Sequence, residues 1–252
     1  MDGFLETEGL TKQFGELTAL DNVTMSIAAD DVTAVIGPNG AGKTTLFNLL
    51  SGKYRPTTGK VQFRGNRIDA KPPHERYRVG IARSFQIPNF FPNLTALENV
   101  RLATQSDETG FRPRDFLRHY ADLKQPLTEA HAVLERLGLE DIADEPPVNL
   151  AHGQQRHLEI AIAVGSDPDL LLMDEPTSGM SPDETQETMT LIEEIATETT
   201  LLIIEHDMDV VMNVSDRIAV MNQGRLLTMD VPEHVREDQQ VQDVYLGEGQ
   251  IT

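Results

Sequence analysis

Short runs of apolar and β-branched residues recur along the chain and predict strands that are buried on both faces. The clearest runs are Val32–Ile36, Leu170–Met173 and Thr200–Glu205. Leu20–Ile27 alternates apolar with polar residues, and Lys60–Phe63 follows a turn at residues 54–59, so both are expected to be strands near the N-terminus. Continuous apolar runs, such as the first three, are typical of strands in a parallel sheet.

Segments with apolar residues three or four positions apart lie between these strands and predict helices. The predicted helices are Thr44–Leu50, Thr95 to about Ala103, Thr128–Leu137 and Gly153 to about Val164. Two segments, Thr95–Glu98 and Ser181–Glu184, have the sequence of a capping box at the start of a helix. A hairpin-like pair around Gln223 and a short final helix are expected near the end. Strands and helices that alternate in this way indicate an α/β fold.

The segment Gly37–Thr44, with the sequence GPNGAGKT, matches the phosphate-binding pattern GxxxxGK[ST]. It follows a predicted strand and opens a predicted helix, which is the setting that an anion site requires. Lys43 would reach the β- and γ-phosphates, and the Thr44 hydroxyl would bind Mg²⁺. The alternative, a glycine-rich turn that binds nothing, does not explain this setting. The pattern therefore predicts binding of a nucleoside triphosphate.

A pair of carboxylates follows the apolar run Leu170–Met173. In a parallel sheet, Asp174 and Glu175 would lie at the carboxyl end of their strand, beside the phosphate loop. Asp174 could hold Mg²⁺ through water, and Glu175 could orient or deprotonate an attacking water. The alternative is a helix-capping pair before Pro176. We interpret the pair as catalytic because it accompanies a phosphate loop.

The net charge of the chain is −20, and it is unevenly distributed. Residues 1–86 carry 11 Lys and Arg against 9 Asp and Glu, whereas residues 151–252 carry 4 against 21. Such an excess of acidic residues argues against nucleic-acid binding, which requires a basic face. The acidity and the small share of lysine favour a folded protein adapted to a salt-rich cytoplasm; the alternative is an ordinary acidic enzyme.

Several general features narrow the class of protein. The chain has no cysteine, so disulfides and thiolate metal sites are excluded. It has no run of about 18 apolar residues, and its first residues do not resemble a signal peptide. The seven histidines form no ligand pattern.

The segment Leu150–Arg156, with the sequence LAHGQQR, resembles the signature loop of ATP-binding-cassette (ABC) ATPases. It precedes the Asp174–Glu175 strand, as in that family. Gln86 matches the family's glutamine loop, His206 its switch histidine, and residues 178–183 its aspartate-containing loop. Phe14 matches the aromatic residue that stacks on adenine. The ordered set of motifs covers essentially the whole chain.

The resemblance implies an α/β P-loop NTPase fold, with a mostly parallel RecA-like core sheet, an N-terminal antiparallel β subdomain and an inserted α-helical subdomain. Residues 1–252 would form a single ABC domain. Its nucleotide-binding core would comprise residues 1–86 and 157–252, and the helical subdomain with the signature loop would comprise residues 87–156.

The resemblance also assigns roles to the site residues. Lys43, Glu175 and His206 would be catalytic, and Thr44, Gln86 and Asp174 would hold Mg²⁺. The residues expected to bind ATP are Phe14, Gly37, Pro38, Asn39, Gly40, Ala41, Gly42, Lys43, Thr44, Thr45, Gln86, Ala151, Gly153 and Gln154.

Four stretches look like the ATPases of branched-chain amino acid importers: Gly80–Gln86, Leu97–Val100, Glu205–Met208 and Val244–Gly247. This implies a cytoplasmic subunit held on the inner face of the membrane by permease subunits and served indirectly by an extracytoplasmic binding protein. A second ABC ATPase, expected to be a different chain, would complete each active site with its signature loop. The two aromatics of Asn89–Pro92 would lie in a groove for a permease helix, or else pack on the helical subdomain.

Three alternatives remain at this stage. An importer of urea or short amides would have the same motifs. A non-transport ABC protein of DNA repair or translation would need a long coiled coil or a second cassette, neither of which the sequence has. A pseudo-ATPase scaffold conflicts with the intact Lys43, Asp174, Glu175 and His206.

The sequence departs from the family at one site residue. Ala151 stands where the usual signature serine bonds the γ-phosphate, so that contact, worth about 1.5–3 kcal/mol, is absent. The backbone donors of Gly153 and Gln154 are expected to remain, which weakens the partner's site without abolishing it.

The excess of acidic residues in 151–252 generates a prediction about salt. Raising KCl from about 0.1 M to about 1 M, where the Debye length falls to ~3 Å, should raise the melting temperature because the self-repulsion is screened. A sucrose series without added salt is the control. A melting temperature that stays flat or falls with KCl would contradict adaptation to high salt.

Overall fold

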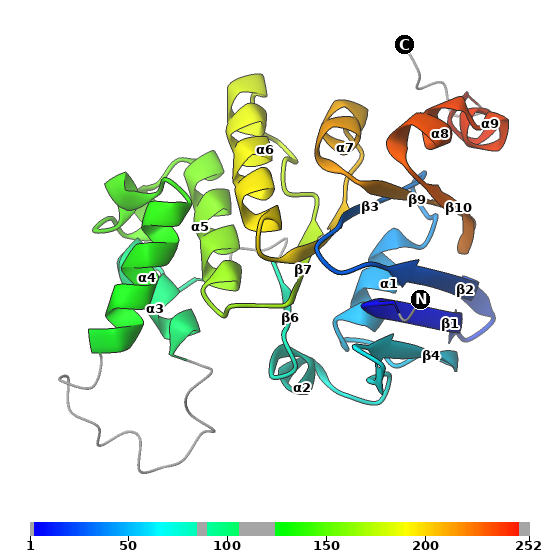
Figure 1. Cartoon of the computed structure of the whole chain (residues 1–252), viewed down its shortest axis with the longest axis horizontal. Coiled ribbons are helices and arrows are strands. Elements are labelled where there is room, and N and C mark those ends of the chain that lie inside the picture. Colours follow the sequence, from blue (N-terminus) through cyan, green and yellow to red (C-terminus); the bar gives the residue numbers. More distant parts are fainter. Residues whose placement is uncertain (1–2, 85–89, 106–123, 247–252) are drawn as a thin grey trace.

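The computed structural model describes residues 3–84, 90–105 and 124–246 (Figure 1). The N-terminal half forms a four-stranded antiparallel sheet in the order β2-β1-β4-β5. Its strands are β1 (Leu5–Phe14), β2 (Leu17–Ile27), β4 (Thr58–Phe63) and β5 (Asn66–Arg67). This confirms the expected antiparallel β subdomain, although β4 begins at Thr58, inside the segment predicted to be a turn.

The second sheet has six strands in the order β10-β9-β3-β8-β7-β6. They are β3 (Val32–Ile36), β6 (Ile81–Arg83), β7 (Leu170–Asp174), β8 (Thr200–Ile204), β9 (Arg217–Asn222) and β10 (Arg225–Asp230). All neighbours are parallel except β10, which forms a hairpin with β9 at one edge. The mostly parallel core sheet is therefore confirmed, as is the hairpin around Gln223.

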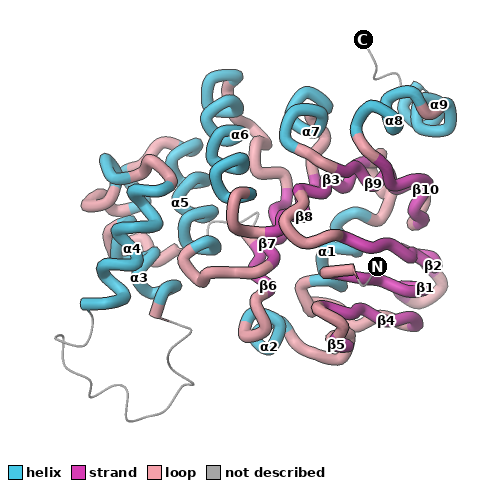
Figure 2. The backbone as a smooth tube through the Cα atoms, in the orientation of Figure 1, coloured by secondary structure: helices cyan, strands magenta, loops and turns pink. Residues whose placement is uncertain are grey.

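Alternate residues of the parallel strands face two different cores. In β7, Leu170 and Leu172 pack with α1 (Lys43–Leu50) and the antiparallel sheet, whereas Leu171 and Met173 pack with the helices on the other face. These helices are α5 (His152–Val164), α6 (Pro182–Ala196) and α7 (Met208–Val214). Figure 2 shows the strands of the large sheet running between these two layers. Burial on both faces explains why the strands are uninterrupted apolar runs.

The remaining helices lie around this core. They are α2 (Pro73–Tyr77), α3 (Ala96–Thr104), α4 (Lys124–Arg136), α8 (Pro232–Glu237), α9 (Gln239–Leu246) and the 3₁₀ turns Glu140–Ile142 and Pro147–Asn149. Helices α3, α4 and α5 pack together at one end of the molecule (Figure 1). The boundary expected at residue 156 falls within α5, and the limits of the helical subdomain stay a prediction.

Local sequence signals set the starts of α3 and α6. The Thr95 hydroxyl accepts a hydrogen bond from the Glu98 N–H at the start of α3, and Ser181 and Glu184 form a reciprocal capping box before α6. Helix α4 begins four residues before the predicted Thr128, and two short helices stand where one was predicted at the end. Gln86 and Asn89 lie outside the described residues.

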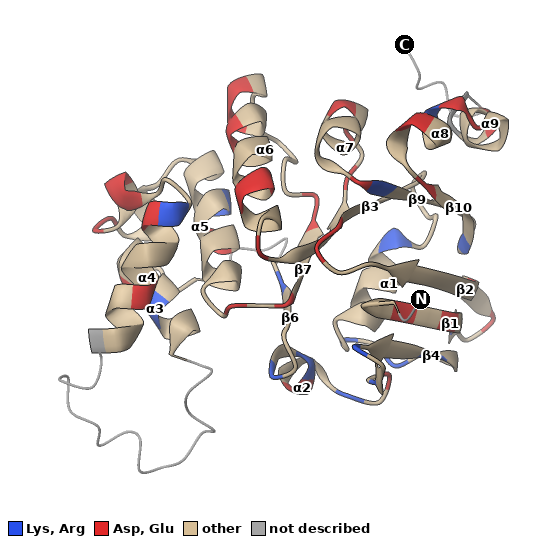
Figure 3. Ribbon diagram, in the orientation of Figure 1, with Lys and Arg blue, Asp and Glu red and all other residues tan. Residues whose placement is uncertain are grey.

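Acidic and basic residues lie on different parts of this fold. Figure 3 shows acidic residues along α6, α7 and α8, whereas basic residues gather around α2. Within the described ranges, no helix is both long and apolar enough to cross a membrane.

Candidate functional site

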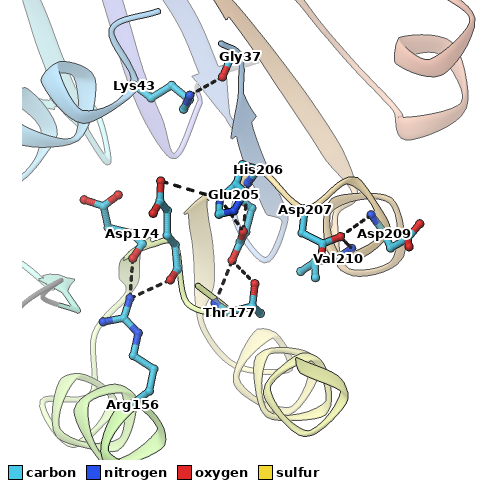
Figure 4. A network of polar contacts seen from close by, with 11 residues as sticks. Gly37, Lys43, Arg156, Asp174, Thr177, Glu205, His206, Asp207, Asp209 and Val210 are labelled. Carbon is cyan, nitrogen blue, oxygen red and sulfur yellow. Dashed lines mark hydrogen bonds and ion pairs between the residues drawn. The ribbon is translucent and has the colours of Figure 1, made fainter. Parts of the chain in front are cut away.

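Three adjacent parallel strands bring the predicted site residues to one edge of the large sheet. Val35 of β3 and Asp174 of β7 are both in register with Ile204 of β8. The residues that follow these strands therefore emerge side by side: the phosphate loop, Glu175, and the pair Glu205–His206. Figure 4 shows Lys43 and Gly37 on one side of this edge, facing Asp174 and His206.

The phosphate loop takes a backbone path that only glycine allows at two positions. Gly37 has φ 145°, and a Cβ there would lie 2.1 Å from the Met221 carbonyl oxygen. Gly42 has φ 99°, and its Cβ would lie 2.8 Å from the carbonyl oxygen of Ala19. Side chains at either position would displace neighbouring backbone. Asn39 and Gly40 stay exposed at the tip, so the loop presents its main chain outward.

Lys43 lies over this loop. Its ammonium group donates hydrogen bonds to the carbonyl oxygens of Gly37 and Pro38, the latter at 3.1 Å. Thr44, in the first turn of α1, is exposed. A cation, an exposed hydroxyl and a helix N-terminus in one place fit a nucleoside polyphosphate.

Asp174 is buried and pairs with an arginine that the sequence did not single out for a role of its own. The Arg83 guanidinium contacts Asp174 Oδ2 at 2.8 Å. It also donates to Asn48 Oδ1 at 2.8 Å and Ser51 Oγ at 3.2 Å, both in the region of α1. Arg83 thus ties one oxygen of the Asp174 carboxylate to the helix that follows the phosphate loop.

These oxygen donors fit Mg²⁺. A hydroxyl and one carboxylate are the usual protein contribution when substrate phosphates supply the other ligands. In the described part of the chain, no three His, Asp or Glu side chains are grouped so as to hold a metal by themselves. The expected contribution of Gln86 falls on residues that the structure does not describe.

Glu175 occupies an uncommon conformation directly after β7. Its φ is 50°, in the left-handed region, which costs of order 1–3 kcal/mol for a non-glycine residue. Its N–H donates to the Ile204 carbonyl oxygen at 2.9 Å, and its own carbonyl oxygen accepts from the Ser178 N–H at 3.2 Å. The side chain is partly exposed, at 31%. This turn therefore points the Glu175 carboxylate out from the edge of the sheet, on the side where the phosphate loop lies.

Glu205 organises the neighbouring strand end. Its buried carboxylate accepts hydrogen bonds from the Thr177 N–H at 3.0 Å, the Thr177 hydroxyl at 2.7 Å and the His206 N–H at 3.1 Å. His206 is exposed, and its Nδ1 lies 3.9 Å from Glu175 Oε1 (Figure 4). Glu205 thereby joins the segment after Glu175 to the backbone of His206.

The segment Leu150–Arg156 begins α5. Ala151 is the N-cap residue and has no side-chain acceptor, while Gln154 Oε1 accepts from the Ala151 N–H at 3.1 Å. Gly153 is buried against Glu184, and a Cβ there would lie 2.6 Å from Glu184 Oε1. Hydrogen bonds from the Ser181 backbone and side chain, followed by the charge of His152 and the Gly153 backbone, hold the pKa of Glu184 below its usual value. Helices α5 and α1 lie well apart (Figure 1), so this segment does not join the chain's own phosphate loop.

Phe14 lies at the tip of the β1–β2 hairpin, where it pairs with Leu17. Its ring is 42% exposed, packs edge-on against Tyr54 at 5.3 Å and lies 5.0 Å from the ammonium of Lys12. Ala19, two residues beyond Leu17, touches the phosphate loop at Gly42.

Phe91 projects from the loop before α3 and is 60% exposed, so packing on the helical subdomain does not account for it. Asn99 fixes this loop by accepting from the Phe91 N–H at 2.7 Å and donating to its carbonyl oxygen at 3.1 Å.

Sequence reasoning overlooked Arg83 and Arg156 as members of the site. Arg156, on α5, donates to the carbonyl oxygens of both Asp174 and Glu175. For Arg83 the available signal was a charged residue at the end of the apolar run Ile81–Ala82, whereas Arg156 lies among polar residues that gave no such signal.

Comparison with known proteins gives a consistent picture. Residues 20–178 match the family model described as ABC transporter. The chain is 40% identical to the high-affinity branched-chain amino acid transport ATP-binding protein LivG of Escherichia coli, with 97% of this chain and 98% of that protein covered. It also resembles the solved ADP conformation of an ATP-binding cassette of an ABC transporter, with a TM-score of 0.84, 34% identity, and coverage of 98% and 100% of the two chains. A dimeric cassette in a post-hydrolysis state, bound to ADP and phosphate, aligns with a TM-score of 0.75 and 26% identity over 90% of this chain and 98% of the other.

The buried Glu205–Thr177 contact generates a stability prediction. Thr177→Val removes a hydroxyl donor to a buried carboxylate and should lower the free energy of unfolding by about 1.5–3 kcal/mol. The control is Thr190→Val on the exposed face of α6, where the hydroxyl bonds only to the Gln186 carbonyl oxygen. Chemical denaturation of both variants measures the difference. Equal losses in the two variants would contradict a special role for the Glu205 contact.

Proposed function

The chain belongs to the ATP-binding subunits of ABC transporters, and we propose that it hydrolyses ATP to drive uptake of branched-chain or related amino acids through a membrane permease. One observation supports the catalytic part most directly. The phosphate loop, Asp174, Glu175 and His206 meet at one sheet edge because β3, β8 and β7 are adjacent and parallel. The 40% identity to a branched-chain amino acid transport subunit supports the cargo class.

In the proposed reaction, the phosphate loop holds the triphosphate through backbone N–H groups, and Lys43 leaves its carbonyl partners to neutralise the β- and γ-phosphates. Thr44 and Asp174, together with Gln86, would hold Mg²⁺, which offsets phosphate charge when bound. Arg83 keeps Asp174 in place for this task.

Glu175 acts as the general base. Its carboxylate takes a proton from a water molecule as the water oxygen attacks the γ-phosphorus. The bond from that phosphorus to the β–γ bridging oxygen breaks, and the products are ADP and inorganic phosphate. His206, at the end of the neighbouring strand, donates a hydrogen bond to the γ-phosphate. Phe14 supplies a ring face for adenine, with Tyr54 fixing the ring from its edge.

The second half of each active site would come from a partner ATPase. The segment Leu150–Gln154 stands apart from the chain's own phosphate loop, which supports its use by the facing subunit (Figure 1). Exposed Phe91 is a candidate contact for the permease, which would hold the chain at the cytoplasmic face of the membrane. An extracytoplasmic binding protein would deliver the amino acid.

The role of Glu175 is tested by Glu175→Gln. The variant should bind ATP with unchanged affinity but hydrolyse it about 10²-fold more slowly or worse, because the amide cannot accept the proton. Glu193→Gln, on the exposed face of α6, is the charge-matched control. ATP affinity and steady-state phosphate release are measured for both. Near-normal hydrolysis by Glu175→Gln would remove the general base from the proposal.

The pairing with a different ATPase is tested through Ala151. A homodimer would lack the signature hydroxyl in both sites, so we expect slow hydrolysis by the purified chain and faster hydrolysis once the second ATPase and the permease are added. Ala151→Ser should raise turnover in the site that receives this loop, by up to about tenfold if the added bond contributes ~1.4 kcal/mol to the transition state. Full activity of the lone wild-type chain, unchanged by partners, would show that this pairing is wrong.

A further inference from the structure

Arg156 connects the helix of the signature segment to the turn that carries the general base. One of its terminal nitrogens donates to the Asp174 carbonyl oxygen at 2.6 Å and to the Glu175 carbonyl oxygen at 3.1 Å. The other donates to Glu159 Oε2 at 2.9 Å. Figure 4 shows the side chain extending from α5 to these two carbonyl groups.

The turn at Glu175 needs such support. Its left-handed conformation is disfavoured for a side-chain-bearing residue, so the surrounding contacts must hold it. The Ile204 carbonyl oxygen fixes the Glu175 N–H from the side of β8, and Arg156 fixes the two carbonyl groups from the side of α5. Hydrogen bonds from a charged donor are stronger than those between neutral groups. Arg156 therefore restrains the carbonyl groups on both sides of the Glu175 Cα.

Glu159 holds the guanidinium in the orientation that reaches the turn. It lies one helical turn after Arg156 and is buried, with 8% of its surface exposed. Burial raises the pKa of Glu159, while the hydrogen bond and charge of Arg156 act in the opposite direction. The pair thus satisfies a charge that would be costly alone, while the second terminal nitrogen of Arg156 donates to the two carbonyl groups.

We propose that Arg156 is a positioning residue for hydrolysis, which sets the Glu175 peptide and couples it to the start of α5. Arg156 lies five residues after Ala151, so a shift of the signature segment moves the guanidinium and with it the Glu175 carbonyl group. One side chain, that of Arg156, then joins the segment that contacts the partner's nucleotide to the base that acts on the chain's own nucleotide. This inference rests on the proposed function, in which Glu175 is the base.

The test uses the full chain, assembled with its partners, and a double variant that leaves no buried charge unpaired. Arg156→Met with Glu159→Gln should lower single-turnover hydrolysis by about 10- to 100-fold, the scale of a misplaced catalytic group. ATP affinity should stay unchanged. Arg156→Lys, which keeps the charge but loses the planar fork, should recover part of the rate.

The matched control is Arg136→Met. Arg136 also joins two helices, since it donates to the Glu194 carbonyl oxygen at 3.1 Å and pairs with Glu194 and Glu198, but it lies on α4, away from the site. Arg136→Met should leave the rate of hydrolysis unchanged, and the melting temperatures of both variants are measured so that a loss of stability is separated from a loss of rate. An equal loss of rate in this control, or a parallel loss of ATP affinity in the double variant, would reduce Arg156 to a structural role and overturn the proposal.

A second comparison separates this inference from the proposed function. In a Glu175→Gln background, the double variant should lower the residual rate by less than about twofold, because the group that Arg156 positions is already disabled. A full further loss would show that Arg156 acts elsewhere. Wild-type hydrolysis by the double variant would show that the arginine only neutralises Glu159. If Glu175→Gln alone stays active, Glu175 is not the general base of the proposed function, whatever Arg156 does.

Discussion

The parallel pairing of β3, β8 and β7 is the constraint on which the site depends. Its register sets Val35, Ile204 and Asp174 at one level, so that the next residues of all three strands leave the sheet together. The chain can then place the phosphate loop, the Glu175 carboxylate and His206 side by side although they are far apart in sequence. Apolar side chains on both faces of these strands hold the register, since a slip of one residue would exchange the two cores.

Arginine side chains contact the residues at this edge of the sheet, although the protein as a whole is strongly acidic. Residues 151–252 contain four arginines and no lysine, and Arg156 is one of those four. It lies at the site, as does Arg83 from the N-terminal half, and each pairs with a buried carboxylate. A planar guanidinium with several donors can satisfy a carboxylate and further oxygen acceptors at once, which a lysine cannot do. The acidic surface of α6 and α7 can vary without disturbing these pairs because they are buried.

Two side chains, one from α5 and one from α6, contact the residues around the signature segment Leu150–Arg156 and the neighbouring edge of the sheet. Arg156 reaches from α5 to the turn after β7, and Glu184 reaches from the first turn of α6 to Gly153 at the start of α5. The start of α5 is therefore connected both to the turn after β7 and to the first turn of α6.

The sequence by itself determined the elements and the chemistry that depend on short stretches of chain. The phosphate loop, the strand ends at Asp174 and Glu205 and the caps of α3 and α6 were predictable, because each is specified by residues within a few positions of one another. Only the tertiary structure decided the contacts of Arg83 with Asp174, 91 residues away, of Arg156 with the Asp174 and Glu175 carbonyl groups, 18 and 19 residues away, and of Glu184 with Gly153. An arginine can pair with any of the chain's many carboxylates and carbonyl groups, and only packing of the strands and helices selects which of them lies within hydrogen-bond distance.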